Sequence, residues 1–328
     1  MQSLHTSRPT KVVLLTGASG FIGARVQSLL VKSGFHLRVL ARKPGPPLPQ
    51  VTHFLGDLTD PSECRRAVND ISVIIHMAGE KLDSSRFWSV NVQGTKNLLD
   101  AAVCEGVERF VHVSSIGVIG ADPFQAVVFD ENAPCRPQDD YERTKWGAEK
   151  VLRQVGVEVP VVILRPVNVF GDRDPDQTLL ALARTVRDGR FVFVGGRDSI
   201  INMVFVDDVA HAILGIAEHP SAVGRTYHLS DTCTLGEFVD TLADHLGVKR
   251  PTLEMPKPVA RLVRVVLRGA RKLRWLSNSA GFGRLVSLNN QASFASSRLA
   301  DDLGFAFPVG WRHGVKRMVA WYRSQGIL

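Results

Sequence analysis

Short apolar runs alternate with helical patterns through the first half of the chain. Apolar residues recur every three to four positions in the segments between these runs, for example over 22–30, which predicts amphipathic helices. Alternating strands and helices favour an α/β fold built on a doubly wound parallel sheet with helices on both faces. The runs that we interpret as buried strands are Val12–Leu15, Leu37–Leu40, Val73–His76, Phe110–Val113 and Val161–Leu164.

The pattern changes after about Phe170. Helical spacing continues in segments 179–186, 209–216, 235–246 and 311–322, but the regular alternation with strands is lost. We therefore predict a main domain over residues 1–170. Residues 171–328 are expected to form mainly a smaller C-terminal substrate-binding lobe, with some segments returning to the main domain. The proline-rich stretch Lys43–Pro49 predicts a linker without regular structure.

The composition is typical of a globular protein. The 328 residues are 45% hydrophobic and 22% charged, which excludes a largely disordered or fibrous chain. No apolar run approaches the ~18 residues that a membrane-spanning helix needs. The cysteines are widely separated and form neither a disulfide nor a zinc pattern, so we expect no metal site and a cytoplasmic location.

Positive charge is concentrated in one segment. The net charge is +8, and residues 249–284 contain ten basic residues and one acidic residue. Helical spacing of apolar and basic positions over 257–274 predicts a basic amphipathic helix. One interpretation is a packed helix with a solvated cationic face. The others are peripheral contact with an anionic membrane and attraction of phosphorylated substrates. No aromatic interleaving supports binding of nucleic acid.

A glycine-rich turn, Thr16–Gly23, follows the first predicted strand and opens the first helix. Gly17 permits a tight turn, Gly20 lets backbone N–H groups approach a pyrophosphate, and Gly23 lets the helix pack closely on the strand. The helix N-terminus directs partial positive charge toward the anion. The turn therefore predicts a Rossmann-like dinucleotide site, which we assign to Gly17, Ser19, Gly20, Phe21, Ile22 and Gly23.

The end of the second predicted strand indicates which dinucleotide binds. An NAD site usually has an acidic side chain there for the ribose 2′-hydroxyl. Here Ala41 and Arg42 occupy that region, and Arg42 can pair with a 2′-phosphate, assisted by Arg38 or Lys43. We therefore predict NADP in preference to NAD. The alternative is a solvated arginine at the end of a strand.

Two further features are typical of acid–base catalysis. Tyr141 and Lys145 lie four residues apart in a predicted helix and share one face. An ammonium beside a phenol lowers the pKa of the phenol, normally near ~10, and suits it to proton transfer. The strand Phe110–Val113 leads to Ser115, whose hydroxyl can hydrogen-bond a substrate carbonyl oxygen. Alone, each feature also fits a surface helix pair or an ordinary turn.

Together these motifs resemble the extended short-chain dehydrogenase/reductase family, which contains nucleotide-sugar epimerases, dehydratases and NADP-dependent carbonyl reductases. Val113-Ser114-Ser115 and Tyr141–Lys145 resemble its catalytic serine strand and its Tyr-Lys pair. Gly56-Asp57-Leu58, His76–Gly79 and Leu164–Gly171 resemble its cofactor-contacting segments. The resemblance implies cofactor contacts at Asp57, Leu58, Met77, Ala78, Gly79, Val113, Tyr141, Lys145, Pro166, Asn168 and Val169.

The resemblance also implies roles for the catalytic residues. Tyr141 would transfer a proton to or from the substrate oxygen, Lys145 would lower the pKa of Tyr141 and bind the nicotinamide ribose, and Ser115 would polarise the carbonyl. Asn91 would either organise a relay water or cap a helix. Asp207 and Asp208 are expected to cap the helix that follows Val206. Family members often form homodimers, so a homodimer is one expected assembly.

Two departures from the family pattern bear on the substrate. Ile119 stands where many nucleotide-sugar enzymes have tyrosine, and Ile201 lies near a position that often holds an arginine for the substrate diphosphate. Apolar walls suit an alcohol, a ketone or a sterol-like substrate, so we favour an NAD(P)-dependent carbonyl reductase or alcohol dehydrogenase. The alternatives are a nucleotide-sugar 4-epimerase or 4-ketoreductase and a non-catalytic dinucleotide-binding sensor. The candidate substrate contacts are Glu80, Ser115, Ile119, Phe170, Ile200 and Ile201.

Overall fold

A parallel seven-stranded sheet forms the centre of the main domain. The fold is that of a computed structural model, which describes residues 11–154, 158–194, 196–255, 259 and 290–328. The strand order is β11-β7-β5-β4-β1-β2-β3, and all six pairings are parallel, which confirms the predicted doubly wound sheet. The strands are β1 (Val12–Thr16), β2 (His36–Ala41), β3 (Val51–Leu55), β4 (Val73–His76), β5 (Arg109–Val113), β7 (Val161–Pro166) and β11 (Thr226–Leu229).

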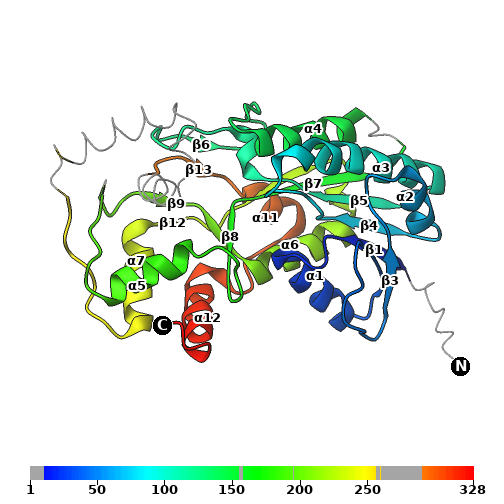
Figure 1. Ribbon diagram of the computed structural model, residues 1–328. Coiled ribbons are helices and arrows are strands. Elements are labelled where there is room, and N and C mark those ends of the chain that lie inside the picture. Colours follow the sequence, from blue (N-terminus) through cyan, green and yellow to red (C-terminus); the bar gives the residue numbers. More distant parts are fainter. Residues whose placement is uncertain (1–10, 155–157, 195, 256–258, 260–289) are drawn as a thin grey trace, which may run out of the picture.

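Helices cover both faces of this sheet, as Figure 1 shows. Successive side chains of a strand point to opposite faces, so Leu14 packs into one hydrophobic layer and Leu15 into the other. Both side chains are fully buried, which explains why the strands are apolar throughout rather than alternating. One face carries α1 (Phe21–Lys32) and α6 (Val206–Glu218), and the other carries α2 (Pro61–Val68), α3 (Gly94–Glu105) and α4 (Asp140–Gln154).

The connection between β2 and β3 contains no helix. Residues 42–50 run past the prolines without regular structure, as predicted. We did not predict β3 or α2. The signal for α2 was present in the sequence, because Asp60 caps its N-terminus by accepting from the N–H groups of Ser62 and Glu63, and Pro61 occupies its first position.

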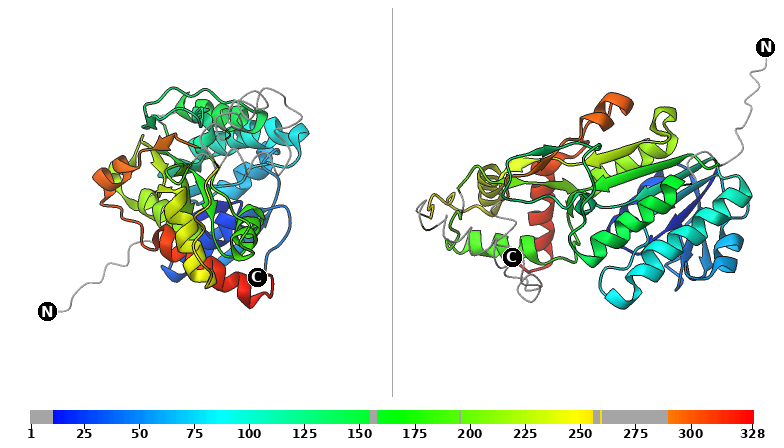
Figure 2. Two further views of the ribbon diagram at one scale, coloured as in Figure 1. Left: turned by 90° about the vertical axis from the view of Figure 1, so that its left-hand side faces the viewer. Right: turned by 90° about the horizontal axis from the view of Figure 1, so that it is seen from above.

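A second hydrophobic core lies beyond the carboxyl ends of the strands. Phe170 packs edge-to-face on Phe205 and Phe238, and Trp311 from the last helix closes the cluster. Figure 2 shows these elements beside the sheet domain. They comprise α5 (Thr178–Arg187), α7 (Leu235–Leu246), α12 (Gly310–Ser324) and the strand pairs β8/β10 (Asn168–Phe170, Met203–Phe205) and β9/β12 (Ile200–Ile201, Cys233–Thr234).

The remaining elements are short. None of the helices in the described ranges is long and apolar enough to cross a membrane. The basic amphipathic helix predicted over 257–274 lies outside the described residues, apart from Val259. The short elements are β6 (Val128–Phe129) with its partner β13 (Ser293–Phe294), α11 (Ser297–Leu303), η1 (Ser84–Arg86), η2 (Ser89–Gln93), η3 (Ile116–Ile119) and η4 (Pro220–Ala222).

Asp208 does not cap its own helix, contrary to the sequence prediction. Phe205 is the N-cap of α6, and it contributes no side-chain hydrogen bond. The buried carboxylate of Asp208 instead accepts from the N–H groups of Val309 and Gly310, at 2.8 and 2.9 Å. It therefore fixes the start of α12 against α6, a long-range contact that the local sequence does not encode.

Candidate functional site

The glycine turn requires its glycines for reasons that the structure makes explicit. Gly17 has a φ of +76°, and a Cβ there would lie 2.6 Å from the N atom of Ala78 at the end of β4. A Cβ on Gly23 would lie 2.0 Å from the carbonyl oxygen of Gly17. Gly23 therefore permits α1 to pack on the turn itself, whereas we had expected close packing on the strand.

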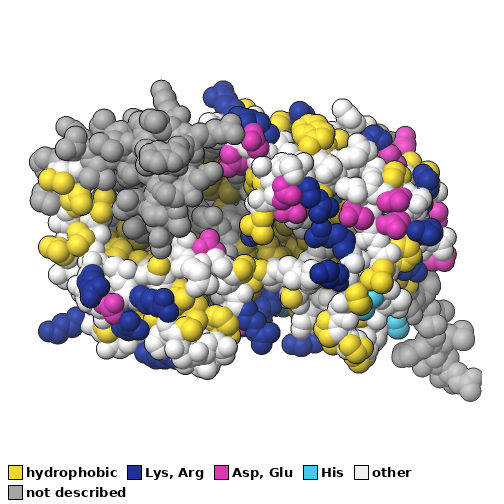
Figure 3. Space-filling view, in the orientation of Figure 1, with side chains coloured by type: hydrophobic (Ala, Val, Ile, Leu, Met, Phe, Trp, Pro, Cys, Tyr) yellow, Lys and Arg dark blue, Asp and Glu magenta, His cyan; other side chains and the backbone are white. Residues whose placement is uncertain are grey.

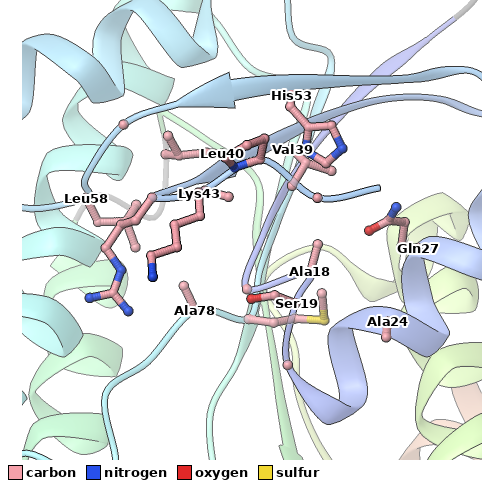
Figure 4. A pocket seen from close by; sticks show the side chains of 18 of the residues that line it. Ala18, Ser19, Ala24, Gln27, Val39, Leu40, Lys43, His53, Leu58 and Ala78 are labelled. Carbon is pink, nitrogen blue, oxygen red and sulfur yellow. The ribbon is translucent and has the colours of Figure 1, made fainter. Parts of the chain in front are cut away.

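A pocket of about 1120 Å³ opens beside this turn. Its walls come from the turn, the pocket-facing side of α1, the ends of β2, β3 and β4, and the connection after β2. In Figure 4, Gln27 and Lys43 lie on opposite sides of the pocket, and the turn that carries Ala18 and Ser19 lies between them. The predicted cofactor residues that line it are Gly17, Ser19, Gly20, Arg42, Asp57, Leu58, Met77, Ala78 and Gly79.

The start of α1 faces this pocket with its backbone. The helical hydrogen-bond ladder begins where the Ala24 N–H donates to Gly20 O, at 2.9 Å, so the first-turn N–H groups have no acceptor within the helix. The side chains of Phe21 and Ile22 pack against the hydrophobic cores instead. Neither residue lines the pocket, whereas Gly20 does, so any contact of Phe21 or Ile22 with a dinucleotide would be made through their N–H groups.

Basic side chains line the pocket, and two of them, Arg42 and Lys43, follow the end of β2. Lys32, Arg42, Lys43 and Arg86 all contribute to its lining. In Figure 3, Lys and Arg side chains gather on the sheet side of the central hollow. Arg38, which we expected to assist Arg42, points elsewhere, because its guanidinium donates to the carbonyls of Ala67 and Asn69 at the end of α2.

Asp57 lies beside these basic groups, with its Oδ2 3.7 Å from the Arg86 guanidinium. Partial burial alone would raise its pKa, but hydrogen bonds from the Thr59 N–H and hydroxyl, together with the charges of Arg86 and Arg42, hold the pKa of Asp57 below its usual value. The side chain is therefore ionised at neutral pH. It belongs to the segment after β3, so the end of β2 itself remains without an acidic group.

The segment after β4 is held by Asn91, which is buried in η2. Its Oδ1 accepts from the Glu80 N–H at 2.7 Å, and its Nδ2 donates to Glu80 O and to the Thr144 hydroxyl, both at 3.0 Å. Asn91 thus joins the pocket wall to α4, a role that neither sequence expectation described. The carboxylate of Glu80, which also lines the pocket, accepts from the N–H groups of Lys81, Leu82 and Asp83 and so stabilises its own loop.

Lys145 lies between the ends of β4 and β5. Its Nζ donates to the carbonyl oxygen of Val113 at 2.9 Å, and a Cβ on Gly79 would lie 3.5 Å from the same nitrogen. Tyr141 is one helical turn earlier on α4 and packs edge-to-face on Phe87, with ring centroids 6.0 Å apart. Ser115 follows Val113 by two residues, and its Oγ accepts from the Gly117 N–H at 3.2 Å, which leaves its O–H able to donate.

The electrostatics of this pair differ from the sequence prediction. Burial raises the pKa of Tyr141 to about 12, and the charges of Asp139 and Glu142 act in the same direction. Burial also lowers the pKa of Lys145 to about 8. The predicted lowering of the Tyr141 pKa is therefore wrong for the protein by itself, because desolvation and the acidic residues at the start of α4 raise that pKa.

The expected apolar substrate wall is only partly formed. Phe170 is 2% exposed and lies in the second core, and Ile119 is also 2% exposed, so neither presents a surface to a ligand arriving from solvent. Ile200 and Ile201 are partly exposed.

The candidate cofactor residues after β7 differ in exposure. Asn168 is exposed, and its Nδ2 donates to Asn202 O at 3.3 Å, whereas Pro166 is buried and Val169 is half-buried.

Several pocket residues were not found from the sequence. They are Gln27, Ser28 and Val31 on α1, His53 on β3, and Arg86, the last residue of η1. The helical residues share one face with the turn, which periodicity could have indicated, but His53 and Arg86 are brought in by the sheet order and by a loop. Within the described residues, no group of three or more His, Cys, Asp or Glu side chains could hold a metal ion.

The chain is similar in sequence to proteins of one enzyme family. A sequence profile described as "NAD dependent epimerase/dehydratase family" matches residues 13–230. The chain is 32% identical over 324 residues to the 3 beta-hydroxysteroid dehydrogenase/Delta 5→4-isomerase of Mycobacterium tuberculosis (strain ATCC 25618 / H37Rv), covering 89% of this chain and 85% of the relative.

Two further relatives act on or bind sugars. The chain is 29% identical to the N-acetyl-alpha-D-glucosaminyl-diphospho-ditrans,octacis-undecaprenol 4-epimerase of Escherichia coli O157:H7, over 76% of this chain and 77% of the relative. Among solved structures, MoeE5 in complex with UDP-glucuronic acid and NAD is 25% identical, with a TM-score of 0.72 over 95% of this chain and 99% of that one.

Proposed function

Because the chain belongs to the NAD-dependent epimerase/dehydratase family, we propose that it is an NADP-dependent oxidoreductase that interconverts a hydroxyl and a carbonyl group, with Tyr141 as the acid and base. Lys145 and Ser115 complete the proposed catalytic set. The position of Lys145 carries this proposal, since its ammonium contacts Val113 just before the serine and lies against Gly79 on the pocket wall.

The residues of the pocket fit a dinucleotide. The turn at Gly17 and Gly20 and the first-turn N–H groups of α1 would hold the pyrophosphate, and the Ala78–Gly79 segment would lie along the nicotinamide half. When bound, the nicotinamide supplies or accepts the hydride.

The protein's own groups then handle the proton and the charge. Tyr141 is protonated across neutral pH because burial raises its pKa to about 12, so it can donate a proton to the oxygen of a carbonyl that is being reduced. The Ser115 hydroxyl would hydrogen-bond the same oxygen as negative charge develops. The Lys145 ammonium would then stabilise the phenolate that remains, through the interaction of opposite charges.

The preference for NADP rests on the basic residues of the pocket. Arg42 and Lys43 line it beside the end of β2, where the strand offers no carboxylate. A 2′-phosphate would offer these cations a negative charge in addition to that of Asp57, whereas the 2′-hydroxyl of NAD would offer none. Arg42→Ala is expected to weaken NADPH binding at least tenfold and to change NADH binding by less than twofold. Equal losses for both cofactors in a fluorescence titration would contradict this assignment.

The substrate class that we favour is a largely apolar alcohol or ketone. Ile200 and Ile201 are half-buried in β9, Ile201 packs against the second core, and neither carries a charge for a diphosphate. The steroid dehydrogenase relative covers most of this chain and is named for such a substrate. A 4-epimerase acting on a diphosphate-linked sugar is the second candidate, because the Escherichia coli relative is named for that reaction.

Cofactor turnover separates the two candidates. Purified protein would be incubated with NADPH and a panel of steroid and aliphatic ketones, and separately with diphosphate-linked sugars. Consumption of NADPH at 340 nm with a ketone, abolished by Tyr141→Phe, is the expected result. Formation of an epimeric sugar without net change in the cofactor would overturn the first proposal in favour of the second. Tyr141→Phe should leave NADPH affinity within about twofold.

A further inference from the structure

A buried hydrogen-bond chain runs through His76 at the end of β4. The ring is fully buried, its Nδ1 lies 2.7 Å from the Thr16 hydroxyl, and its Nε2 lies 2.9 Å from the Thr95 hydroxyl. The Thr16 oxygen also accepts from the Ala78 N–H at 3.2 Å, and the Thr95 hydroxyl donates to Asn91 O at 2.6 Å. The chain thus links the glycine turn, the pocket wall and η2.

These contacts determine which group donates and which accepts in each hydrogen bond around His76. Because the Thr95 hydroxyl gives its proton to Asn91 O, its oxygen can only accept from His76, so Nε2 carries the hydrogen. The other ring nitrogen, Nδ1, is then an acceptor, and the Thr16 hydroxyl donates to it. A neutral imidazole in a single tautomer satisfies all members. Burial, which lowers the pKa of His76 to about 3, agrees with this neutral state.

The hydrogen-bond chain through His76 fixes one end of the backbone segment Ala78–Glu80, and the Asn91 side chain fixes the other end. Ala78 is held through Thr16 and His76, while the N–H and C=O groups of Glu80 are held by the Asn91 side chain. Gly79 lies between them, against the Lys145 ammonium. A displacement of His76 would therefore change the segment that lines the pocket and that sets the distance to Lys145.

We propose that His76 is a positioning residue for the dinucleotide site, which acts by accepting from Thr16 and donating to Thr95 so that the Ala78–Glu80 backbone is held against the pocket and Lys145. The inference rests on the proposed function only in that the pocket must bind NADPH or NADH. A purely structural histidine would contribute to stability without affecting how tightly the cofactor is held.

Two substitutions of His76 test its two hydrogen bonds separately. An asparagine carries its amide near the position of Nδ1, so His76→Asn can still accept from Thr16. A glutamine reaches the position of Nε2, so His76→Gln keeps the donor to Thr95 but leaves the Thr16 hydroxyl without its acceptor. We expect His76→Gln to raise the dissociation constant of the cofactor about tenfold and the KM for it by a similar factor. His76→Asn should stay within about threefold of the wild type.

His112 provides a matched control. It lies beside His76 on the neighbouring strand, with ring centroids 5.3 Å apart, and is equally buried. Neither of its ring nitrogens has a hydrogen-bond partner within the described residues. His112→Gln should therefore lower the melting temperature without changing the cofactor dissociation constant, measured by fluorescence titration below the melting temperature of every variant.

The outcomes separate this inference from the proposed function. Equal affinities of the wild type, His76→Gln and His76→Asn would overturn the positioning role while leaving the proposed function intact. If the wild type binds neither NADPH nor NADH, the proposed function fails and the inference fails with it. If His76→Gln does not fold, Thr16→Val removes the same bond with little change in shape; an unchanged dissociation constant for that variant would equally overturn the proposal.

Discussion

Replacing Lys145 with methionine is expected to make the protein more stable and inactive at once. The lysine is buried, and burial lowers its pKa from 10.5 to about 8. At about 1.4 kcal/mol per pH unit, holding the protonated ammonium in the folded protein costs about 3 kcal/mol below pH 8. Methionine has a similar length and no charge, so Lys145→Met removes this cost together with the bond to Val113 O, which contributes about 1 kcal/mol.

The difference in folding stability between Lys145→Met and the wild type is expected to change sign with pH. The unfolded chain binds the lysine proton more tightly than the folded protein, so the stability of the wild type rises as the pH climbs from about 8 to about 10.5. Below pH 8, Lys145→Met should therefore be more stable than the wild type by about 2 kcal/mol. As the pH approaches 10.5, the advantage should vanish and reverse, because the hydrogen bond to Val113 O is then the larger contribution.

Guanidinium unfolding at several pH values between 7 and 10.5 measures this difference, since other titrating groups cancel between the two proteins. Lys150→Met serves as the control, because Lys150 is an exposed lysine of the same helix. Its effect should be within about 0.5 kcal/mol at every pH. A Lys145→Met protein that is less stable than the wild type at pH 7, or a difference that does not change with pH, would refute the reasoning.

Three other substitutions test the packing around the site. Gly23→Ala should abolish dinucleotide binding in a titration, because its Cβ would lie 2.0 Å from Gly17 O; retained affinity would contradict the proposed turn geometry. Glu149→Ala should cost about 3–5 kcal/mol in chemical unfolding, since it leaves the buried Arg165 guanidinium without its ion-pair partner, and a loss below 1 kcal/mol would disagree. Asp208→Ala should lower stability by about 2–3 kcal/mol, by removing the acceptor for two N–H groups at the start of α12, whereas Asp207→Ala should cost less than 1 kcal/mol.

The sheet was predictable because strands that are buried on both faces consist of consecutive apolar residues. The apolar runs at β1, β4, β5 and β7 need only local inspection, and the turn at Gly17 follows from its spacing. The short strands of the second core were not predictable, because two- or three-residue strands carry no periodicity. Their pairings, such as Ile200–Ile201 with Cys233–Thr234, join segments about thirty residues apart.

The catalytic candidates show the same division. The spacing of Tyr141 and Lys145 places them on one helical face, but the sequence could not reveal that the Lys145 ammonium binds Val113 O. Nor could it show that burial and acidic neighbours would raise the pKa of Tyr141, because desolvation depends on everything packed around a group. Arg38 illustrates the same point, since the end of α2 rather than the pocket takes its guanidinium.

The sequence by itself determined the parallel sheet, the glycine turn, the basic residue after the second strand and the helical pairing of a tyrosine with a lysine, because each depends on neighbours along the chain. Only the tertiary structure decided the hydrogen-bond directions through His76, the burial of Ile119 and Phe170 and the charge states of the site. Those properties depend on the solvent that is excluded and the partners that meet when distant segments pack together, and both arise only once the chain has folded.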